Sequence, residues 1–124
     1  MTTLTIPLTR EKLVRYAGAS GDFNPIHYSD HFARKLGQES VIGHGMLTMG
    51  LAMRLVTDFA APEKVRSCRF RFKRPVPVPD DAEGAALHLE LEASDPDDMS
   101  VITCSLTARV GDDVVGSGKA EVVA

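Results

Sequence analysis

The chain has 124 residues, of which 44% are hydrophobic and 25% are charged, with a formal net charge of -3. This length suits one domain and leaves no room for two, so we expect a single domain over residues 1–124. Cys68 and Cys104 form no CxxC pair, which argues against a disulfide framework or a zinc knuckle, and the longest apolar stretch is interrupted by Arg54 and too short to span a bilayer.

The first third of the chain predicts a strand followed by two helices. Residues 5–8 alternate as a short strand, and the hydroxyl of Thr9 is placed to cap a helix over residues 10–19, which Gly18 and Gly21 end. Residues 21–29 are expected to be a loop stiffened by Pro25. Ser29 then caps a short helix over residues 30–36.

A longer helix is predicted over residues 44–60. It is apolar on nearly every face, a pattern typical of a helix buried on all sides. Gly50 lies in its middle and costs about 1 kcal/mol relative to alanine, so we expect another backbone to come close there.

From residue 65 onward the hydrophobic period changes to two. Four strands are predicted: one from residue 65 that ends before the prolines at 75, 77 and 79, and three over residues 85–93, 99–110 and 114–123. Turns at 95–98 and 111–113 join the last three as hairpins. The pattern predicts an α+β fold in which an antiparallel sheet wraps around the buried helix.

The charge distribution is uneven. Six positive charges and no negative one fall between residues 64 and 74, so the rest of the chain is strongly acidic. We call Arg66, Arg69, Arg71, Lys73 and Arg74 the basic strip. It indicates either a local anionic partner, other than nucleic acid, or simply the solvated face of a strand.

The densest group of reactive side chains is the run from Gly21 to His27. Asp22 and His27 are five residues apart on a loop stiffened by Pro25, so a turn can direct both toward one water as a general acid/base pair. Asn24 between them can hold a carbonyl or orient the loop. In the alternative interpretation, Asp22 and Asn24 only make Asx turns.

A second group, Gly43-His44-Gly45-Met46, starts the long helix. No Ser, Thr, Asp or Asn caps this start, so the first amides are free to bind an anion or a polarised carbonyl oxygen. For a thioester this would be an oxyanion hole. Alternatively, His44 packs there and water fills the gap.

A metal site is a weaker alternative. His27 and His31, with Asp22 or His44, imitate a set of two histidines and a carboxylate, but the two histidines need not share a face. We therefore expect no metal. No nucleotide-binding glycine loop or nucleophile elbow is present.

Two sequence blocks resemble the MaoC-like, (R)-specific enoyl hydratases and dehydratases. They are residues 16–30, YAGASGDFNPIHYSD, and residues 42–48, IGHGMLT. Within that family the chain is most similar to the catalytic B subunits of mycobacterial-type (3R)-hydroxyacyl-ACP dehydratases, a similarity that extends over residues 7–56 and the proline-rich run at 75–79.

The resemblance implies a hotdog fold and reversible addition of water to trans-2-enoyl thioesters in fatty-acid or polyketide metabolism. It implies that Asp22 and His27 hold the water, that the Gly45 amide binds the thioester oxygen, and that Asn24, Pro25 and His44 support the site. No cofactor is expected beyond the phosphopantetheine of acyl carrier protein or CoA that carries the substrate.

The resemblance also implies a partner. We expect a homodimer or a heterodimer with a sister hotdog subunit, with the basic strip as a candidate contact for acyl carrier protein or CoA. A cytoplasmic protein is expected because the first residues lack the features of a secretory signal. The alternatives are a noncatalytic acyl-thioester-binding subunit and a hotdog thioesterase.

Overall fold

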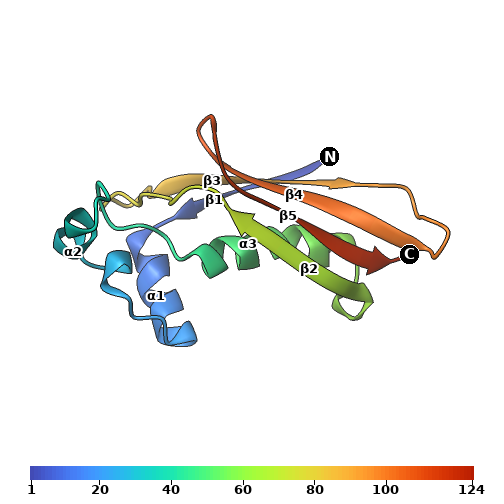
Figure 1. The fold of residues 1–124 in the computed structure, drawn as a ribbon, viewed down its shortest axis with the longest axis horizontal. Coiled ribbons are helices and arrows are strands. Elements are labelled where there is room, and N and C mark those ends of the chain that lie inside the picture. Colours follow the sequence, from blue (N-terminus) through green and yellow to red (C-terminus); the bar gives the residue numbers. More distant parts are fainter.

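An antiparallel sheet of five strands, in the order β1-β3-β4-β5-β2, forms one layer of the structure (Figure 1). The structure is a computed structural model that describes all residues, 1–124. The strands are β1 (Thr2–Leu8), β2 (Val65–Phe72), β3 (Ala85–Ala93), β4 (Val101–Val110) and β5 (Asp113–Val123).

The inner face of the sheet forms most of the core. On β3, Leu87 and Leu89 have no exposed surface and Leu91 is 2% exposed, while the residues between them point outward. This is the alternation of a half-buried strand, and the bounds of β3 are those predicted. The predicted α+β class and hairpin order β3-β4-β5 are confirmed.

Two strand bounds differ from the prediction by two residues or more, and β5 begins one residue early, at Asp113. β4 begins at Val101 and not at residue 99, because the Asp97 carboxylate accepts hydrogen bonds from the amides of Met99 (2.8 Å) and Val101 (3.0 Å). This Asx-type turn also holds Ser100 at a φ of 60°. β1 begins at Thr2, before the predicted residue 5, because it pairs along its whole length with β3.

The three α-helices are α1 (Arg10–Ser20), α2 (Asp30–Lys35) and α3 (Gly45–Phe59). Figure 1 shows α3 against one side of the sheet, with α1 and α2 gathered at one end of it. Thr9 and Ser29 cap α1 and α2 as predicted, each accepting a hydrogen bond from the third residue on. Gly21 ends α1 in the left-handed conformation that a glycine adopts without strain. No helix is long and apolar enough to cross a membrane.

The central helix α3 packs on the inner face of the sheet with only part of its circumference. Thr48, Ala52, Leu55 and Val56 are buried, whereas Met46 is 59% exposed. The prediction that this helix is buried on all sides is therefore wrong for the single chain. The expected backbone neighbour of Gly50 is also absent, since a Cβ added there would meet nothing within 4 Å.

Both cysteines are free thiols, as expected, and they point to the inner side of the sheet. Cys104 is buried, and Cys68 on β2 is half-buried with its sulfur 3.0 Å from that of Met53 on α3. Burial raises the pKa of both thiols, which keeps them protonated and unreactive at neutral pH.

Asp30 anchors the helical side of the molecule. Its carboxylate accepts two hydrogen bonds from the Arg10 guanidinium, at 2.9 and 3.2 Å, and one from the Val41 amide at 2.9 Å. Arg10 also donates to the carbonyl of Val78 at 2.8 Å. The Val41 amide and the Arg10 side chain hold the pKa of Asp30 below its ordinary value.

We expect Asp30→Asn to lower the free energy of unfolding by about 1 to 3 kcal/mol at pH 7. The neutral amide cannot pair with the charge of Arg10 and accepts fewer hydrogen bonds from Arg10 and Val41 than the carboxylate does. Since the folded pKa is depressed, this contribution is complete above about pH 4 and is lost as pH falls further. In urea unfolding, the free energies of unfolding of wild type and Asp30→Asn should differ at pH 7 and become similar at pH 3. The exposed Asp58→Asn serves as control, and a constant difference at both pH values would contradict the assignment.

Candidate active site

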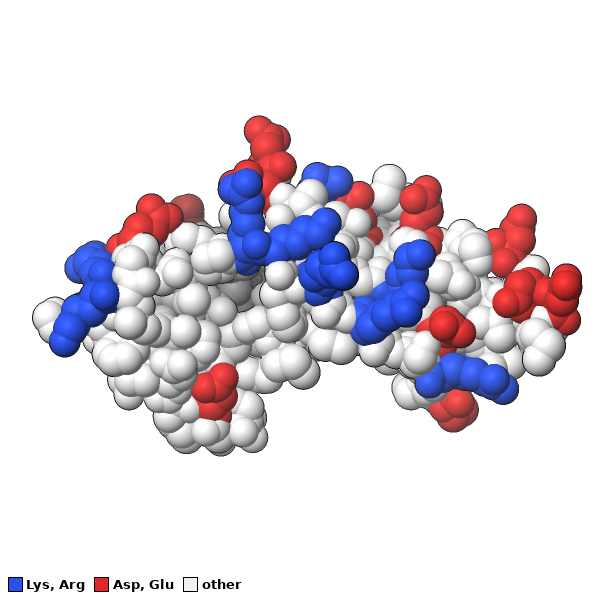
Figure 2. Space-filling model, viewed as in Figure 1, with Lys and Arg blue, Asp and Glu red and all other residues white.

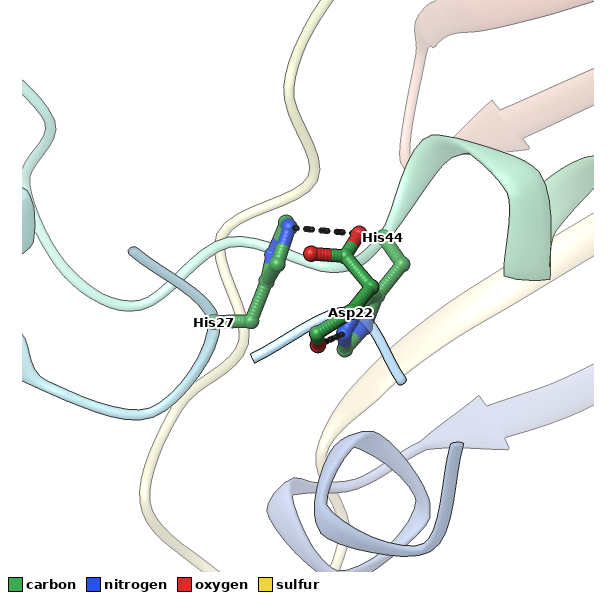
Figure 3. Close-up of side chains that lie close together, drawn as sticks. All are labelled: Asp22, His27 and His44. Atoms are coloured by element: carbon green, nitrogen blue, oxygen red, sulfur yellow. Dashed lines mark hydrogen bonds and ion pairs between the residues drawn. The ribbon is translucent and has the colours of Figure 1, made fainter. Parts of the chain in front are cut away.

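Asp22 and His27 meet on the loop between α1 and α2. The Oδ2 atom of Asp22 lies 3.8 Å from Nε2 of His27, and Figure 3 shows the carboxylate turned toward the ring. The His27 side chain is 9% exposed and that of Asp22 is 50% exposed. A buried imidazole therefore faces a carboxylate that water can reach.

A backbone carbonyl fixes the ring of His27. Nδ1 lies 2.8 Å from the carbonyl oxygen of Ile42, which can only accept, so Nδ1 carries the proton in this bond. In the neutral ring the lone pair is then on Nε2, on the side of Asp22. This bond prepares His27 to accept a proton at one defined atom.

His44 packs against both members of the pair. Its ring stacks on that of His27 with centroids 3.8 Å apart, and its Nε2 donates to the backbone carbonyl of Asp22 at 3.2 Å (Figure 3). Nδ1 of His44 is buried without a partner. Burial, and secondarily the neighbouring His27, lower the pKa of His44, so it stays neutral and does not add a charge beside His27.

The loop itself is held by Asx turns. Oδ1 of Asp22 accepts from the Asn24 amide (3.3 Å), and Oδ1 of Asn24 accepts from the Ile26 amide (3.2 Å). Pro25 starts a single turn of 3-10 helix, Pro25–His27, that the sequence did not predict. The two interpretations of this loop are therefore compatible: one carboxylate oxygen of Asp22 shapes the turn while the other faces His27.

A cavity of about 350 Å³ adjoins His27 and the first turn of α3. It is lined by His27, Ile42, Gly43, Gly45, Thr48, Phe72, Lys73, Arg74, Pro75, Val76 and Val115. Asp22 is not among these residues. The N-cap His44 makes no capping bond with its side chain, and the amide of Gly45 has no backbone acceptor. A free donor at the positive end of a helix therefore borders the same cavity as His27.

Phe72 forms the cavity wall beside the start of α3, and Phe70 packs next to it. A Cβ on Gly45 would lie 3.2 Å from the Phe72 ring, so this glycine lets the ring pack directly on the helix. Phe70 lies 5.4 Å from Phe72 between ring centroids, and it covers Gly116 and Gly118 on β5, where any Cβ would collide with its ring. The aromatic pair thus connects β5 to the first turn of α3.

Three contributors to the site were not predicted as such. The Ile42 carbonyl orients His27, but a backbone atom has no signature in the sequence. Phe72 falls within the strand predicted from residue 65, and its place at the cavity was not predicted. Thr48, 4% exposed, stands three residues after Gly45 and lines the cavity, and a hydroxyl so close to the free amides is the signal that could have identified it.

The basic strip divides into two parts. Lys73 and Arg74 follow the end of β2 and line the cavity, whereas Arg66, Arg69 and Arg71 lie on the strand and do not. Figure 2 shows positive side chains gathered along β2. All five residues are exposed, and within the strip only Arg74 has a carboxylate nearby, that of Asp113 at 3.7 Å.

Asp22, His27 and His44 are also the one group whose ligand-type atoms come within 4.8 Å of one another. His31, which the sequence made a candidate ligand, is exposed and outside this group. The two rings of the group are stacked, and one nitrogen of each already bonds a backbone carbonyl. Stacked rings do not direct their nitrogens at a common ion, so the arrangement suits acid–base chemistry better than metal ligation.

Comparisons with known proteins agree on one family. A family model described as "MaoC like domain" matches residues 1–109. The 3-hydroxybutyryl-CoA dehydratase of Methylorubrum extorquens is 34% identical over 117 residues, which cover 93% of this chain and 72% of that protein.

Solved structures give the same result. A "MaoC-like dehydratase" superimposes with a TM-score of 0.92 and 30% identity over 99% of this chain, which spans only 38% of that protein. The (R)-hydratase from A. caviae involved in PHA biosynthesis gives a TM-score of 0.83 with 25% identity, covering 98% of this chain and 92% of the other. The hotdog fold expected from the resemblance is thereby confirmed.

The lowered pKa of His44 predicts how stability depends on pH. The unfolded chain takes up a proton near the ordinary value of about 6.5, whereas folded His44 resists protonation, so stability should fall as pH is lowered from about 7 to about 5. His44→Gln cannot take up this proton and should show a flatter dependence in urea unfolding. The exposed His31→Gln should behave as wild type. If the free energies of unfolding of wild type and His44→Gln changed with pH in the same way, the prediction would be wrong.

Proposed function

Because the chain belongs to the MaoC-like domain family, we propose that it is a hydro-lyase that reversibly hydrates trans-2-enoyl thioesters to (3R)-hydroxyacyl thioesters in fatty-acid metabolism. The observation that carries the proposal is the pairing of Asp22 with Nε2 of His27 beside a cavity into which a free helix amide opens. The relatives described above, a dehydratase of a CoA thioester and an (R)-hydratase, support it.

In the proposed reaction Asp22 and His27 share one water molecule. Its hydroxyl adds to C3 of the enoyl group and a proton is delivered to C2; dehydration is the reverse. The Ile42 carbonyl holds the proton on Nδ1 of His27, so Nε2 is free to accept one from the water. Since both side chains contact the same water, either can exchange the C2 proton.

The Gly45 amide is proposed to bind the thioester oxygen. Addition at C3 moves negative charge onto this oxygen, and a donor at the N-terminus of α3 stabilises the enolate-like state. Thr48, one turn into the helix, lines the same cavity and adds a hydroxyl to it. Asp22, His27 and the water thus supply the acid–base chemistry of the proposed step, and the start of α3 stabilises the charge on the thioester oxygen.

Lys73 and Arg74 are proposed to contact the carrier of the acyl group. Both line the cavity and both are exposed, so they are placed to meet an anionic group entering from outside. The phosphate of phosphopantetheine, on acyl carrier protein or on CoA, is the group that cations at this position would bind.

The proposed pair is tested by substitution. Asp22→Asn and His27→Ala should each lower kcat for hydration of an enoyl thioester by about 10² to 10⁴, because each removes one member of the acid–base pair. The double variant should be little worse than either single one, since the two groups act as a unit. Loss of enoyl absorbance gives the rate, and circular dichroism checks the fold.

Matched controls are Asp112→Asn and His31→Ala, which remove an exposed carboxylate and an exposed imidazole elsewhere. They should retain the wild-type rate. Near-wild-type hydration by both Asp22→Asn and His27→Ala would contradict the proposal. Release of free thiol without a change in enoyl absorbance would instead identify a thioesterase.

The role of Gly45 gives a separate expectation. In Gly45→Ala the new methyl group would lie 3.2 Å from Phe72, so either the ring gives way or the first turn of α3 moves. We expect the amide to lose its alignment and kcat to fall by about 10-fold. Phe72→Leu in the same chain makes room and should partly restore the rate. Gly18→Ala, where a Cβ meets nothing within 4 Å, is the control. Full activity of Gly45→Ala would contradict the expected effect of this contact on the site.

A further inference from the structure

The hydroxyl of Thr48 on α3 makes no hydrogen bond within the chain. A threonine in a helix usually donates from its hydroxyl to the carbonyl three or four residues earlier. Thr57 does so on the same helix, with Oγ1 lying 3.3 Å from the Met53 carbonyl oxygen and 3.2 Å from that of Arg54. At Thr48 only the backbone amide bonds to the corresponding carbonyl, that of His44, at 3.2 Å. The helix thus forms without using the Thr48 hydroxyl.

Thr48 is nevertheless almost completely buried. The residue is 4% exposed, and an unpartnered hydroxyl in such a setting is costly. The one side-chain nitrogen or oxygen that is fully covered and without a partner is Nδ1 of His44, so the oxygen of Thr48 is not sealed inside the core. Thr48 lines the cavity of about 350 Å³ beside His27. Its hydroxyl is therefore available to a molecule that enters this cavity.

Thr48 and Gly45 reach the cavity from the same side of α3. Of the first four residues of the helix, these two line the cavity, whereas Met46 and Leu47 do not. Residues three apart share one face of a helix, and each Cα–Cβ bond tilts toward the helix N-terminus. The side chain of Thr48 is thus directed toward the turn that carries the free amide of Gly45. In Figure 3 this helix begins directly after His44, beside the candidate pair.

The rest of the cavity wall offers few groups that suit a carbonyl oxygen. Apart from the exposed cations Lys73 and Arg74, His27 and Thr48 have the only polar side chains that line it. Nε2 of His27 is assigned to the water in the proposed reaction, and the two cations to the carrier. Thr48 therefore supplies a neutral donor that the reaction has not yet used, one helical turn from the amide of Gly45.

We infer that the Thr48 hydroxyl is a second donor to the thioester oxygen, beside the Gly45 amide. Negative charge builds on this oxygen as the hydroxyl of water adds to C3, so two fixed donors bind the enolate-like state more strongly than the ground-state carbonyl. Thr48 donates a hydrogen bond and keeps its proton, and Asp22, His27 and the water still perform the proton transfer. The inference rests on the proposed hydration of enoyl thioesters and adds a catalytic residue to it.

Two substitutions separate the hydroxyl of Thr48 from the shape of its side chain. Valine keeps the branched shape without a donor, and serine keeps the donor without the methyl group. With crotonyl-CoA as substrate, Thr48→Val should lower kcat by about 10-fold or more with little change in KM, because the lost bond is strongest in the transition state. Thr48→Ser should retain most of the wild-type rate. Thr57→Val, which removes an exposed hydroxyl from the same helix, is the control and should be unchanged.

Two further measurements distinguish this role from a purely structural one. Because the Thr48 hydroxyl bonds to nothing in the free chain, the free energy of unfolding of Thr48→Val in urea should be no lower than that of wild type. Butyryl-CoA labelled with ¹³C at the carbonyl carbon cannot be hydrated, and difference infrared spectroscopy reports its bound C=O group. A hydrogen bond weakens the C=O bond, so its band should lie at lower frequency in wild type and Thr48→Ser than in Thr48→Val.

The outcomes separate this inference from the proposed function. Hydration by wild type with an equal kcat in Thr48→Val would support the function and overturn the role of Thr48. A lower kcat in Thr48→Val with an unchanged C=O band would also overturn it, because the hydroxyl would then act elsewhere. The expected difference in the C=O band, in a chain that hydrates no enoyl thioester, would contradict the proposed function and support Thr48 as a donor to the thioester oxygen.

Discussion

The backbone hydrogen bonds of the short segment 41–43 determine how His27, the start of α3 and the chain at Val76 lie relative to one another. Ile42 donates to the Ile26 carbonyl at 3.1 Å and accepts from Nδ1 of His27 at 2.8 Å. Gly43 donates to Val76 at 2.9 Å, and residue 41 accepts from residue 78 at the same distance. A segment with no regular structure of its own thus joins the loop of His27, the start of α3 and the connection between β2 and β3. These bonds are made in a largely buried setting, where an unpaired amide or carbonyl would be costly.

Features that depend on neighbours in the sequence were predictable. The helix caps at Thr9 and Ser29 and the bounds of β3 follow from a hydroxyl before a helical pattern and from strict alternation. The start of β4 was not, because the Asp97 side chain takes amides that would otherwise continue the strand. The partial exposure of α3 was not predictable either. An apolar pattern indicates that a helix is buried, but it does not show whether the same chain or another molecule buries it.

In the candidate site, too, features set by residues close in the sequence were predictable, and contacts between residues far apart in the chain were not. Asp22 and His27 lie on one short loop, so their approach follows from a proline-stiffened turn. The Ile42 carbonyl orients His27 with a backbone atom that every residue type has. Its role therefore cannot be recognised from the sequence. Phe72 reaches Gly45 only because the sheet brings β2 against the beginning of α3, a contact between residues far apart in the chain. His44 is intermediate: its position was predicted, but its stacking on His27 required the fold.

The two glycines of β5 that face Phe70 affect how the shape of the cavity can change between related proteins. Gly116 and Gly118 leave the room that Phe70 occupies, and Phe70 in turn supports Phe72 at the cavity. Cavity width thus depends partly on β5, a strand far along the sequence from the carboxylate and the imidazole. Larger residues on β5 would displace the aromatic wall and leave the proton-transferring groups where they are. Selectivity and reactivity can therefore drift independently during evolution.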